Sequence, residues 1–276
     1  SYDYLMEKDA LDADECYRLS RQLSHKVTLS TIDQVLKFPF LYRGFEKELG
    51  TMAYSKLVID EIQSYDPRIA AMLIKALEMV AMVGGKFMVM TATLPQIYLD
   101  ELQRRMAKLG QSLVYGEFPN DSMLRHRIAL RSESVLDVVG EILQAGQHRK
   151  GLVICNTVER AIKVYENLRK IAQESSTSVP IHLLHARFIR KHKTALERSI
   201  TLFSGAGWHE KAGTPSLGIW VTTQVVEASL DVDFDLLYTE ACPLDSLFQR
   251  MGRCYRVRIL DRAEPNVYIL RGDVSG

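Results

Sequence analysis

The feature that most constrains the fold of this chain is a repeated alternation of short apolar runs with longer amphipathic segments. From about Ser55 onward, runs such as KLVID (56–60) and GLVICN (151–156) are each followed by a segment in which apolar residues recur at helical spacing. Consecutive parallel strands must be joined by a long crossover, which is usually a helix. The alternation therefore predicts an α/β fold built on parallel sheets.

The remaining apolar runs predict further strands, and the segments between them predict helices. We expect strands at 86–93, 125–130, 181–185, 217–223 and 266–270, and helices at 67–83, at 94–110, up to Gly146, after Thr157, and from about Arg190 and Leu244. Residues 26–36 (KVTLSTIDQVL) predict one more strand, which leads into a helix capped near Ser30 or Thr31.

A polar, turn-rich segment divides this alternation into two parts. Pro119, Asn120 and Asp121 interrupt both helix and strand patterns, and regular alternation resumes after them. A chain of 276 residues is long enough for two domains that each bury a core. The sequence predicts a first domain at 1–118 and a second at 119–276.

Composition excludes several classes of protein. The four cysteines form no CxxC pair, so the sequence indicates neither a zinc site nor a disulfide framework. It has no run of eighteen apolar residues and no signal-peptide pattern, which argues against a membrane protein and favours a cytoplasmic location. The net charge of +1 does not exclude a nucleic-acid partner, because phosphates need only local positive charge.

Two acidic residues stand directly after the first predicted strand. Asp60 and Glu61 follow Leu57-Val58-Ile59, and ligands bind at the carboxyl ends of parallel strands. One carboxylate there can hold Mg²⁺ that bridges phosphates, and the other can orient the attacking water. The alternative is a solvated strand end before a helix, where the helix dipole favours acids.

A basic motif near the C-terminus, QRMGRCYR, has helical spacing. Gln249, Arg253 and Arg256 are separated by four and three residues, so we expect them to share one helix face. A guanidinium presented across an interdomain cleft suits the charge that develops on a γ-phosphate. The alternative is a basic helix end that satisfies its own carbonyl groups.

Five motifs follow one another in a fixed order: DEIQ, TAT, a strand ending in Asn156-Thr157, TTQVVEASLD and QRMGRCYR. This series resembles the superfamily 2 helicases and translocases. The segments DEIQSYDP, LLHARF and TQVVEASLDVDFD look most similar to the CRISPR-associated helicase and nuclease of type I systems. The resemblance covers the chain from about Val27 onward.

The resemblance implies two RecA-like parallel-sheet domains in tandem, the first of them incomplete. It implies ATP and Mg²⁺ as cofactors and single-stranded DNA as the substrate, with ATP hydrolysis coupled to DNA unwinding. It also implies two partners: a CRISPR surveillance complex of the Cascade type, and a nuclease domain or subunit of the His-Asp type supplied elsewhere. None of the seven histidines is followed by Asp, so we expect no nuclease activity in this chain.

The resemblance assigns roles around the nucleotide residue by residue. Asp60 and Glu61 would be the metal-binding and catalytic acids, and Gln63 would link the nucleotide site to the other domain. Asp231 would contact the ribose of the nucleotide. Gln249, Arg253 and Arg256 would act on the γ-phosphate from the second domain.

Other residues would couple hydrolysis to nucleic-acid binding or hold the strand. The coupling residues would be Thr91, Thr93 and Glu227, although Thr93 can equally cap the following helix. The nucleic-acid contacts would be Thr31, Asn156, Thr157, His185, Arg187 and Thr223. For the residues at strand ends the alternative is a helix cap or a turn, and for His185 it is a histidine at the edge of the core.

The sequence departs from the resembled family at one motif. It contains no G-x-x-x-x-G-K-[ST] phosphate-binding loop, and Gly85-Lys86 leads into a predicted strand where such a loop would open a helix. We therefore expect an N-terminally truncated motor that is inactive alone. A DEAH-like RNA helicase and a non-catalytic module that binds nucleic acid or a partner remain as alternatives, and Gln63 and LLHARF favour the CRISPR type.

Overall fold

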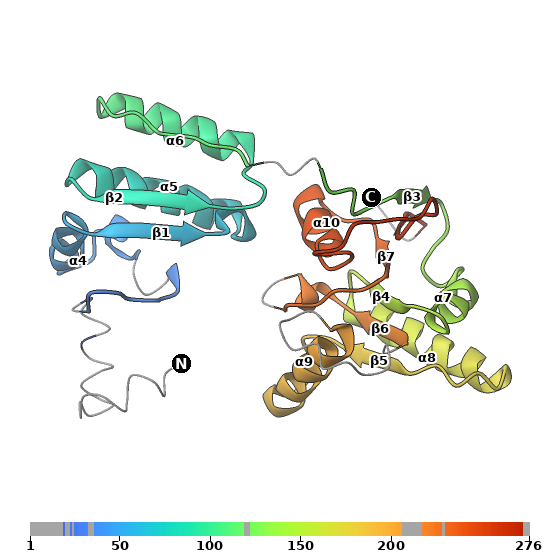
Figure 1. Cartoon of the computed structure of the whole chain (residues 1–276). Coiled ribbons are helices and arrows are strands. Elements are labelled where there is room, and N and C mark those ends of the chain that lie inside the picture. The colour runs from blue at the N-terminus through green and yellow to red at the C-terminus, as the bar shows by residue number, and fades with distance from the viewer. Residues whose placement is uncertain are drawn as a thin grey trace. The chain divides into compact units, whose positions relative to one another are not determined.

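The computed structural model describes residues 19, 23, 25–32, 36–118, 122–205, 217–227 and 230–272. Within it the chain divides into two compact units, residues 1–117 and residues 118–276. Each unit is an α/β structure with its own parallel sheet (Figure 1). Among the described residues, no helix has both the length and the apolar character needed to cross a bilayer.

The first unit is built around two parallel strands joined by a helix. Its elements are η1 (Phe38–Phe40), α4 (Phe45–Met52), β1 (Lys56–Asp60), η2 (Ile62–Ser64), α5 (Pro67–Met82), β2 (Lys86–Met90) and α6 (Gln96–Lys108). Helix α5 begins where expected because the Asp66 carboxylate accepts a hydrogen bond from the Arg68 amide at 2.9 Å, and Pro67 occupies the first helical position. The chain leaves the helix through Gly84, whose φ of +93° suits glycine.

The two faces of this small sheet differ in burial. Leu57, Ile59 and Phe87 pack into a core with α5. On the other face, Val58 and Met88 are 53% and 50% exposed. The two predicted strands are therefore present, but one face of their sheet is exposed because no described element covers it. Strand β2 also ends at Met90, three residues before the expected end.

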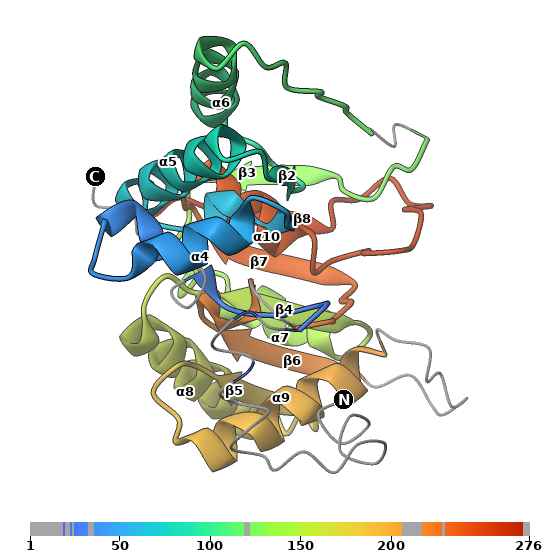
Figure 2. The same ribbon diagram turned by 90° about the vertical axis from the view of Figure 1, so that its left-hand side faces the viewer.

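The second unit contains one six-stranded sheet in which all strand pairs are parallel. The strands are β3 (Ile128–Arg131), β4 (Lys150–Ile154), β5 (Ile181–Leu184), β6 (Gly218–Thr222), β7 (Leu236–Glu240) and β8 (Val267–Leu270). Their order is β3-β8-β7-β4-β6-β5, and Figure 2 shows β7, β4 and β6 side by side. Strand β7 was not among the predicted strands. It inserts between β4 and β8 and completes the middle of the sheet.

Helices cover both faces of the six-stranded sheet. Helices α7 (Val139–Gly146) and α8 (Val158–Glu174) pack on one face, and α9 (Arg190–Ser204) and α10 (Leu244–Met251) pack on the other (Figure 1). Strands β4, β6 and β7 are consequently buried almost throughout. Because the strands are parallel, the residues that follow each of them meet at one edge of the sheet.

The segment before the first unit's helices does not form the predicted strand. Residues 28–31 have no regular secondary structure, and the Ser30 hydroxyl donates a hydrogen bond to the carbonyl of Thr31 at 3.0 Å. The predicted helix after them falls largely on residues 33–35, which lie outside the described residues.

Candidate functional site

Two carboxylates lie at the carboxyl end of β1. Asp60 is the last residue of the strand and is exposed, and Glu61 follows it half-buried. The Glu61 amide donates to the Met90 carbonyl at 2.9 Å, which extends the pairing of the two strands by one residue. Glu61 then adopts a left-handed backbone with φ of +53°, an uncommon conformation for a residue other than glycine, asparagine or aspartate.

A hydrogen-bonded triad joins the ends of β1 and β2. The Gln63 side-chain amide donates to the Glu61 carboxylate, and the Thr91 hydroxyl donates to the Gln63 side-chain oxygen. The Thr91 hydroxyl also lies 3.4 Å from the same Glu61 oxygen. Gln63 is only 7% exposed, so its rotamer is fixed by burial as well as by these two partners. The three residues therefore form one polar unit around the Glu61 carboxylate.

Thr93 does not cap the helix that follows it. Helix α6 begins at Gln96 with Pro95 at its N-cap position, and no side chain caps it. The Thr93 amide instead donates to the Thr91 hydroxyl oxygen at 3.1 Å. The Thr93 hydroxyl is buried and has no hydrogen-bond partner among the described residues.

The donor set at this strand end suits a magnesium ion. Mg²⁺ is commonly bound by one or two carboxylates together with substrate phosphates, and Asp60 and Glu61 offer hard oxygen ligands next to each other. Among the residues that the structure describes, no group of three or more histidines, cysteines and acids is placed to hold a metal ion by itself.

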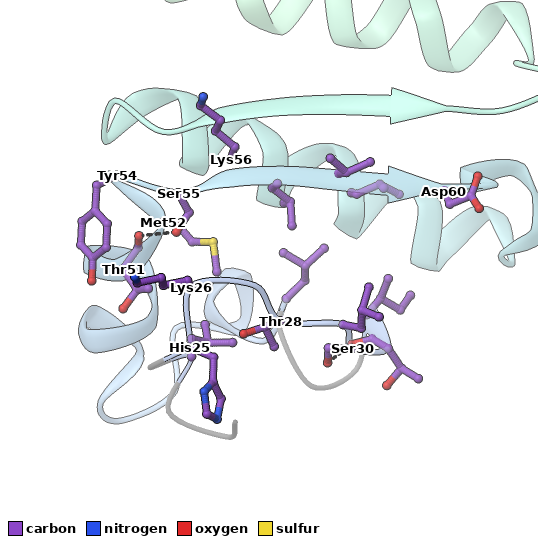
Figure 3. A pocket seen from close by; sticks show the side chains of 18 of the residues that line it. His25, Lys26, Thr28, Ser30, Thr51, Met52, Tyr54, Ser55, Lys56 and Asp60 are labelled. Carbon is purple, nitrogen blue, oxygen red and sulfur yellow. Dashed lines mark hydrogen bonds between the residues drawn. The ribbon is translucent and has the colours of Figure 1, made fainter. Parts of the chain in front are cut away.

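A hollow of 730 Å³ runs along the side of β1 that does not pair with β2. Figure 3 shows Asp60 at one end of the strand and Lys56 at the other, with Thr28 and Ser30 on the opposite wall. Thr31 also lines this hollow and is exposed. A residue predicted to contact nucleic acid thus faces the same strand that carries the acids.

In the second unit a single buried arginine connects three strand ends. Arg250 is 1% exposed and projects from α10. Its guanidinium donates to the Glu227 carboxylate at 2.7 Å, to the Thr239 hydroxyl at 2.9 Å and to the Asn156 side-chain oxygen at 3.0 Å. A fourth bond reaches the Glu240 carbonyl at 3.2 Å. Glu227, which was predicted to be a coupling residue, therefore pairs with an arginine that sequence reasoning did not single out.

Asn156 and Thr157, at the end of β4, both have partners within the chain. The Asn156 side-chain amide donates to the Ala241 carbonyl at 2.9 Å, and its backbone amide donates to the Glu240 carboxylate. Thr157 is the N-cap of α8 and accepts a hydrogen bond from the Arg160 amide at 3.2 Å. The alternative of a helix cap is thus what the structure shows for Thr157, which is still exposed enough to reach a ligand.

The expectation that Gln249, Arg253 and Arg256 share one helix face was wrong. Helix α10 ends at Met251 with Gly252 as its C-cap, so only Gln249 is helical. The chain beyond Gly252 leaves the helix because it pairs with another segment through a parallel bridge between Cys254 and Phe234. Gln249 is half-buried.

The two arginines of this extended segment are held by the loop that carries Asp231. Arg253 donates to the carbonyls of Leu230 at 2.6 Å and Glu227 at 2.7 Å. Arg256 forms an ion pair with Asp231 at 3.1 Å, and both side chains are substantially exposed. The structure therefore brings together three of the residues predicted to contact the nucleotide.

The remaining predicted nucleic-acid contacts lie at the ends of β5 and β6. Thr223 is buried, at 3% exposure, directly after β6. His185 is 8% exposed, stacks on Phe188 with ring centroids 4.3 Å apart, and accepts a hydrogen bond from the Arg187 amide. Burial and the nearby Arg187 charge lower the pKa of His185, which favours a neutral ring. Arg187 is exposed and pairs with Glu159 at 2.6 Å.

Sequence reasoning missed several polar residues, some at the edge where the strands end and others where β4 and β7 begin. They are Arg250, Thr239, Glu240, Asp233, Asp235 and Arg258. Periodicity cannot show that an arginine is buried, because apolar spacing identifies only apolar faces. The run LLYTE at 236–240, with its aromatic and β-branched residues, was the available signal for the strand that carries Thr239 and Glu240.

One family model and several curated relatives that share its description match this chain. Residues 147–259 match the family model described as CRISPR-associated nuclease/helicase Cas3, C-terminal. The CRISPR-associated nuclease/helicase Cas3 of Methanothermobacter thermautotrophicus is 31% identical over an alignment that covers 97% of this chain and 32% of the relative. The chain thus spans about a third of the length of the curated relatives that it matches.

Solved structures show the same fold. The crystal structure of T. fusca Cas3-ADP superposes with a TM-score of 0.81 at 21% identity, covering 97% of this chain and 36% of that one. A chain from the structure of a CRISPR RNA-guided surveillance complex, pre-nicking, superposes with a TM-score of 0.74 at 21% identity, covering 91% of this chain and 35% of that one.

Proposed function

The chain is a homologue of the helicase portion of Cas3, and from this we propose that it supplies ATP-driven translocation along single-stranded DNA in CRISPR interference. The observation that carries the proposal is the triad of Glu61, Gln63 and Thr91 at the ends of two neighbouring parallel strands. A motor must link its water-activating group to a second element that moves. The triad makes that link within the first unit.

We assign the chemistry of hydrolysis to four residues. Glu61 orients the attacking water and accepts its proton, and Gln63 and Thr91 hold the Glu61 carboxylate in one orientation. When bound, Mg²⁺ would be held by Asp60 together with the phosphates, and it would neutralise the charge that develops during phosphoryl transfer.

Arg253 and Arg256 of the second unit are proposed to stabilise the γ-phosphate, with Gln249 beside them, and Asp231 to contact the ribose. In this structure Arg256 and Asp231 pair with each other, and the proposed roles require each to exchange that partner for the nucleotide. An exposed ion pair is worth about 0–1 kcal/mol, so a triphosphate can compete for the arginine.

The proposed architecture is two RecA-like domains in tandem, of which this chain contains an incomplete first and a second. The second unit has the parallel sheet and two helical layers that this fold requires. Within the described residues the first unit contributes two parallel strands, packed on α5 through one face of their sheet.

We propose that the strand of nucleic acid contacts the backbone and hydroxyl groups at the strand ends. The residues proposed to make these contacts are Thr31, Thr157, Thr223, His185 and Arg187. Asn156 would add any side-chain hydrogen bond that its partners within the chain do not use. Thr93 and Glu227 would couple these contacts to the nucleotide. Contacts of this kind bind the phosphate backbone and do not read the base sequence.

The proposed partners follow from the relatives. A structural neighbour belongs to a CRISPR RNA-guided surveillance complex, and we propose that a complex of this Cascade type recruits the protein to DNA in the cytoplasm. The resemblance also implies a nuclease of the His-Asp type, which another domain or subunit would supply.

The binding half of the proposal predicts salt-dependent affinity for single strands. We expect the full-length protein to bind a fluorescent single-stranded DNA at low salt and to lose affinity as salt rises. A plot of the logarithm of the binding constant against the logarithm of the salt concentration should have a slope of about −0.7 per neutralised phosphate. Arg187→Ala should weaken binding and reduce the size of that slope by about 0.7, the contribution of one phosphate contact. Fluorescence anisotropy measures both quantities.

Arg104→Ala is the matched control for this measurement, because Arg104 is also an exposed arginine paired with a glutamate and lies on α6. It should leave binding unchanged. An oligonucleotide of RNA with the same sequence tests the alternative of an RNA helicase, since tighter binding to RNA would favour contacts with the 2′-hydroxyl. No binding at low salt would contradict the proposal.

A further inference from the structure

The segment after α10 forms backbone hydrogen bonds with the segment that precedes β7. The Phe234 amide donates to the Arg253 carbonyl at 3.0 Å, and the Tyr255 amide donates to the Phe234 carbonyl at 3.1 Å. These two bonds form a short parallel pairing next to the main sheet. They hold the chain on both sides of Cys254, between the two arginines that we assign to the γ-phosphate.

A buried carboxylate adds one more hydrogen bond to this segment, at Arg256. Asp233 is 6% exposed. Its Oδ1 atom accepts a hydrogen bond from the Arg256 backbone amide at 3.0 Å. The backbone of Arg256 is therefore fixed by the side chain of Asp233, while the Arg256 guanidinium points to Asp231.

Arg258 holds Asp233 in place. Its guanidinium donates to both carboxylate oxygens of Asp233, at 2.8 and 3.0 Å, to Asp235 at 2.7 Å and to the Phe234 carbonyl at 2.9 Å. It also lies over the Tyr255 ring, 4.4 Å from the centroid. A bidentate arginine fits both oxygens of one carboxylate, which a lysine cannot do.

The charges of Asp233 and Arg258 offset each other only while both side chains are present. Burial alone would lower the pKa of Arg258, but its hydrogen bonds to Asp233 and Asp235 raise it above the usual value. A buried carboxylate without a partner is strongly unfavourable, so burial of Asp233 relies on its hydrogen bonds from Arg258. Neither residue is among those assigned to nucleotide or nucleic acid.

We infer that Asp233 and Arg258 form a clamp that positions Arg253 and Arg256 for the γ-phosphate. This inference rests on the proposed function. The clamp fixes the backbone at the Arg253 carbonyl, the Tyr255 amide and the Arg256 amide, so the two guanidiniums leave a rigid segment in defined directions. Pre-organised cations of this kind stabilise developing charge without reorganising during the reaction.

The test uses the full-length protein with three variants. Asp233→Asn keeps the shape and removes the charge, Arg258→Met keeps the aliphatic stem, and the double variant removes both charges together. Arg131→Met is the matched control, because Arg131 also joins two carboxylates, at 2.9 and 2.7 Å, and lies over a tyrosine ring, on β3 of the same unit. The measurements are single-strand-stimulated kcat and KM for ATP, ADP affinity, thermal midpoint, and amide hydrogen exchange of a peptide spanning 252–259.

Each single variant is expected to raise the exchange rate of that peptide roughly tenfold, the factor that corresponds to one lost charge-assisted hydrogen bond. It should lower kcat roughly ten- to a hundredfold through misplacement of the arginines, with ADP affinity unchanged. The double variant should regain the thermal midpoint without regaining kcat. This result would distinguish a positioning role from a purely structural one. If the pair only stabilised the fold, the double variant would regain the thermal midpoint and kcat together.

If Asp233→Asn does not accumulate as folded protein, Arg258→Lys replaces it in the test. We expect Arg258→Lys to reduce kcat because one ammonium cannot hold both Asp233 oxygens. Variants that match Arg131→Met in exchange and in kcat would overturn the inference while leaving the proposed function standing. A wild-type protein that hydrolyses no ATP would instead remove the proposed function, and the inference with it.

Discussion

Replacing Glu61 with glutamine is expected to lower ATP hydrolysis by the full-length protein about a hundredfold or more, while ATP binding is retained. The Glu61 carboxylate is held by Gln63 and lies 3.4 Å from the Thr91 hydroxyl, and glutamine can keep the same contacts through its side-chain oxygen. Glutamine also tolerates the left-handed backbone at this position about as well as glutamate does. What the substitution removes is the ability to accept a proton from water.

A coupled assay measures turnover of ATP, and a fluorescent analogue measures nucleotide affinity. Glu78→Gln is the matched control, because Glu78 lies in the same unit and pairs with Lys75 at 2.8 Å and Arg105 at 2.6 Å on the α5 and α6 helices. That variant should retain full turnover. If Glu61→Gln hydrolysed ATP at a rate close to that of Glu78→Gln, another group would have to activate the water.

Replacing Arg250 with methionine is expected to destabilise the protein by about 3–5 kcal/mol, the range for removal of one partner from a buried ion pair. Methionine can fill much of the space of the arginine stem but donates no hydrogen bond. The Glu227 carboxylate, the Thr239 hydroxyl and the Asn156 side-chain oxygen would all lose a donor at the buried edge of the sheet. The charge of Glu227 makes the largest contribution, because it would remain buried without its cation.

Urea denaturation followed by circular dichroism measures this loss. Arg104→Met breaks an exposed pair with Glu101 and should change stability by only about 0–1 kcal/mol. Combining Arg250→Met with Glu227→Leu should recover part of the loss, because the second change removes the unpaired carboxylate. A destabilisation by Arg250→Met no larger than that of Arg104→Met would contradict the assigned network.

Five of the six strands of the second unit could be predicted closely from the sequence. The run 217–223 contains β6 (Gly218–Thr222), and 266–270 contains β8 (Val267–Leu270). Both are continuous apolar runs because parallel strands in the middle of a three-layer unit are buried on both faces. The same rule failed for β1 and β2, because burial on both faces depends on elements that cover the sheet.

Strand β7 and the end of α10 show a different limit. Residues 236–240 follow directly after the motif that ends at Asp235, and no strand was predicted between residues 223 and 266. The spacing in QRMGRCYR is compatible with a helix, but the extended pairing of Cys254 with Phe234 ends the helix at Met251. Tertiary pairing of this kind leaves no local pattern.

The residues of the candidate site also fall into those that the sequence indicated and those that it did not. The acids and the arginines were proposed because their residue types suit a chemistry and their order resembles a family, and their roles stay predictions. The residues that orient them could not, because Arg250 and Arg258 act through buried contacts with segments more than ten residues away. Asn156 and Thr157 were predicted as ligand contacts with a structural alternative, and the structure shows partners within the chain for both.

The central claim is that this chain belongs to a motor in which nucleic acid stimulates ATP hydrolysis. The most direct test is to measure ATP hydrolysis by the full-length protein with and without single-stranded DNA, beside Arg253→Ala. We predict hydrolysis that DNA stimulates and that Arg253→Ala reduces about a thousandfold, the scale reported for arginines that act on a γ-phosphate. Hydrolysis that is absent, or that responds neither to DNA nor to Arg253→Ala, would contradict it.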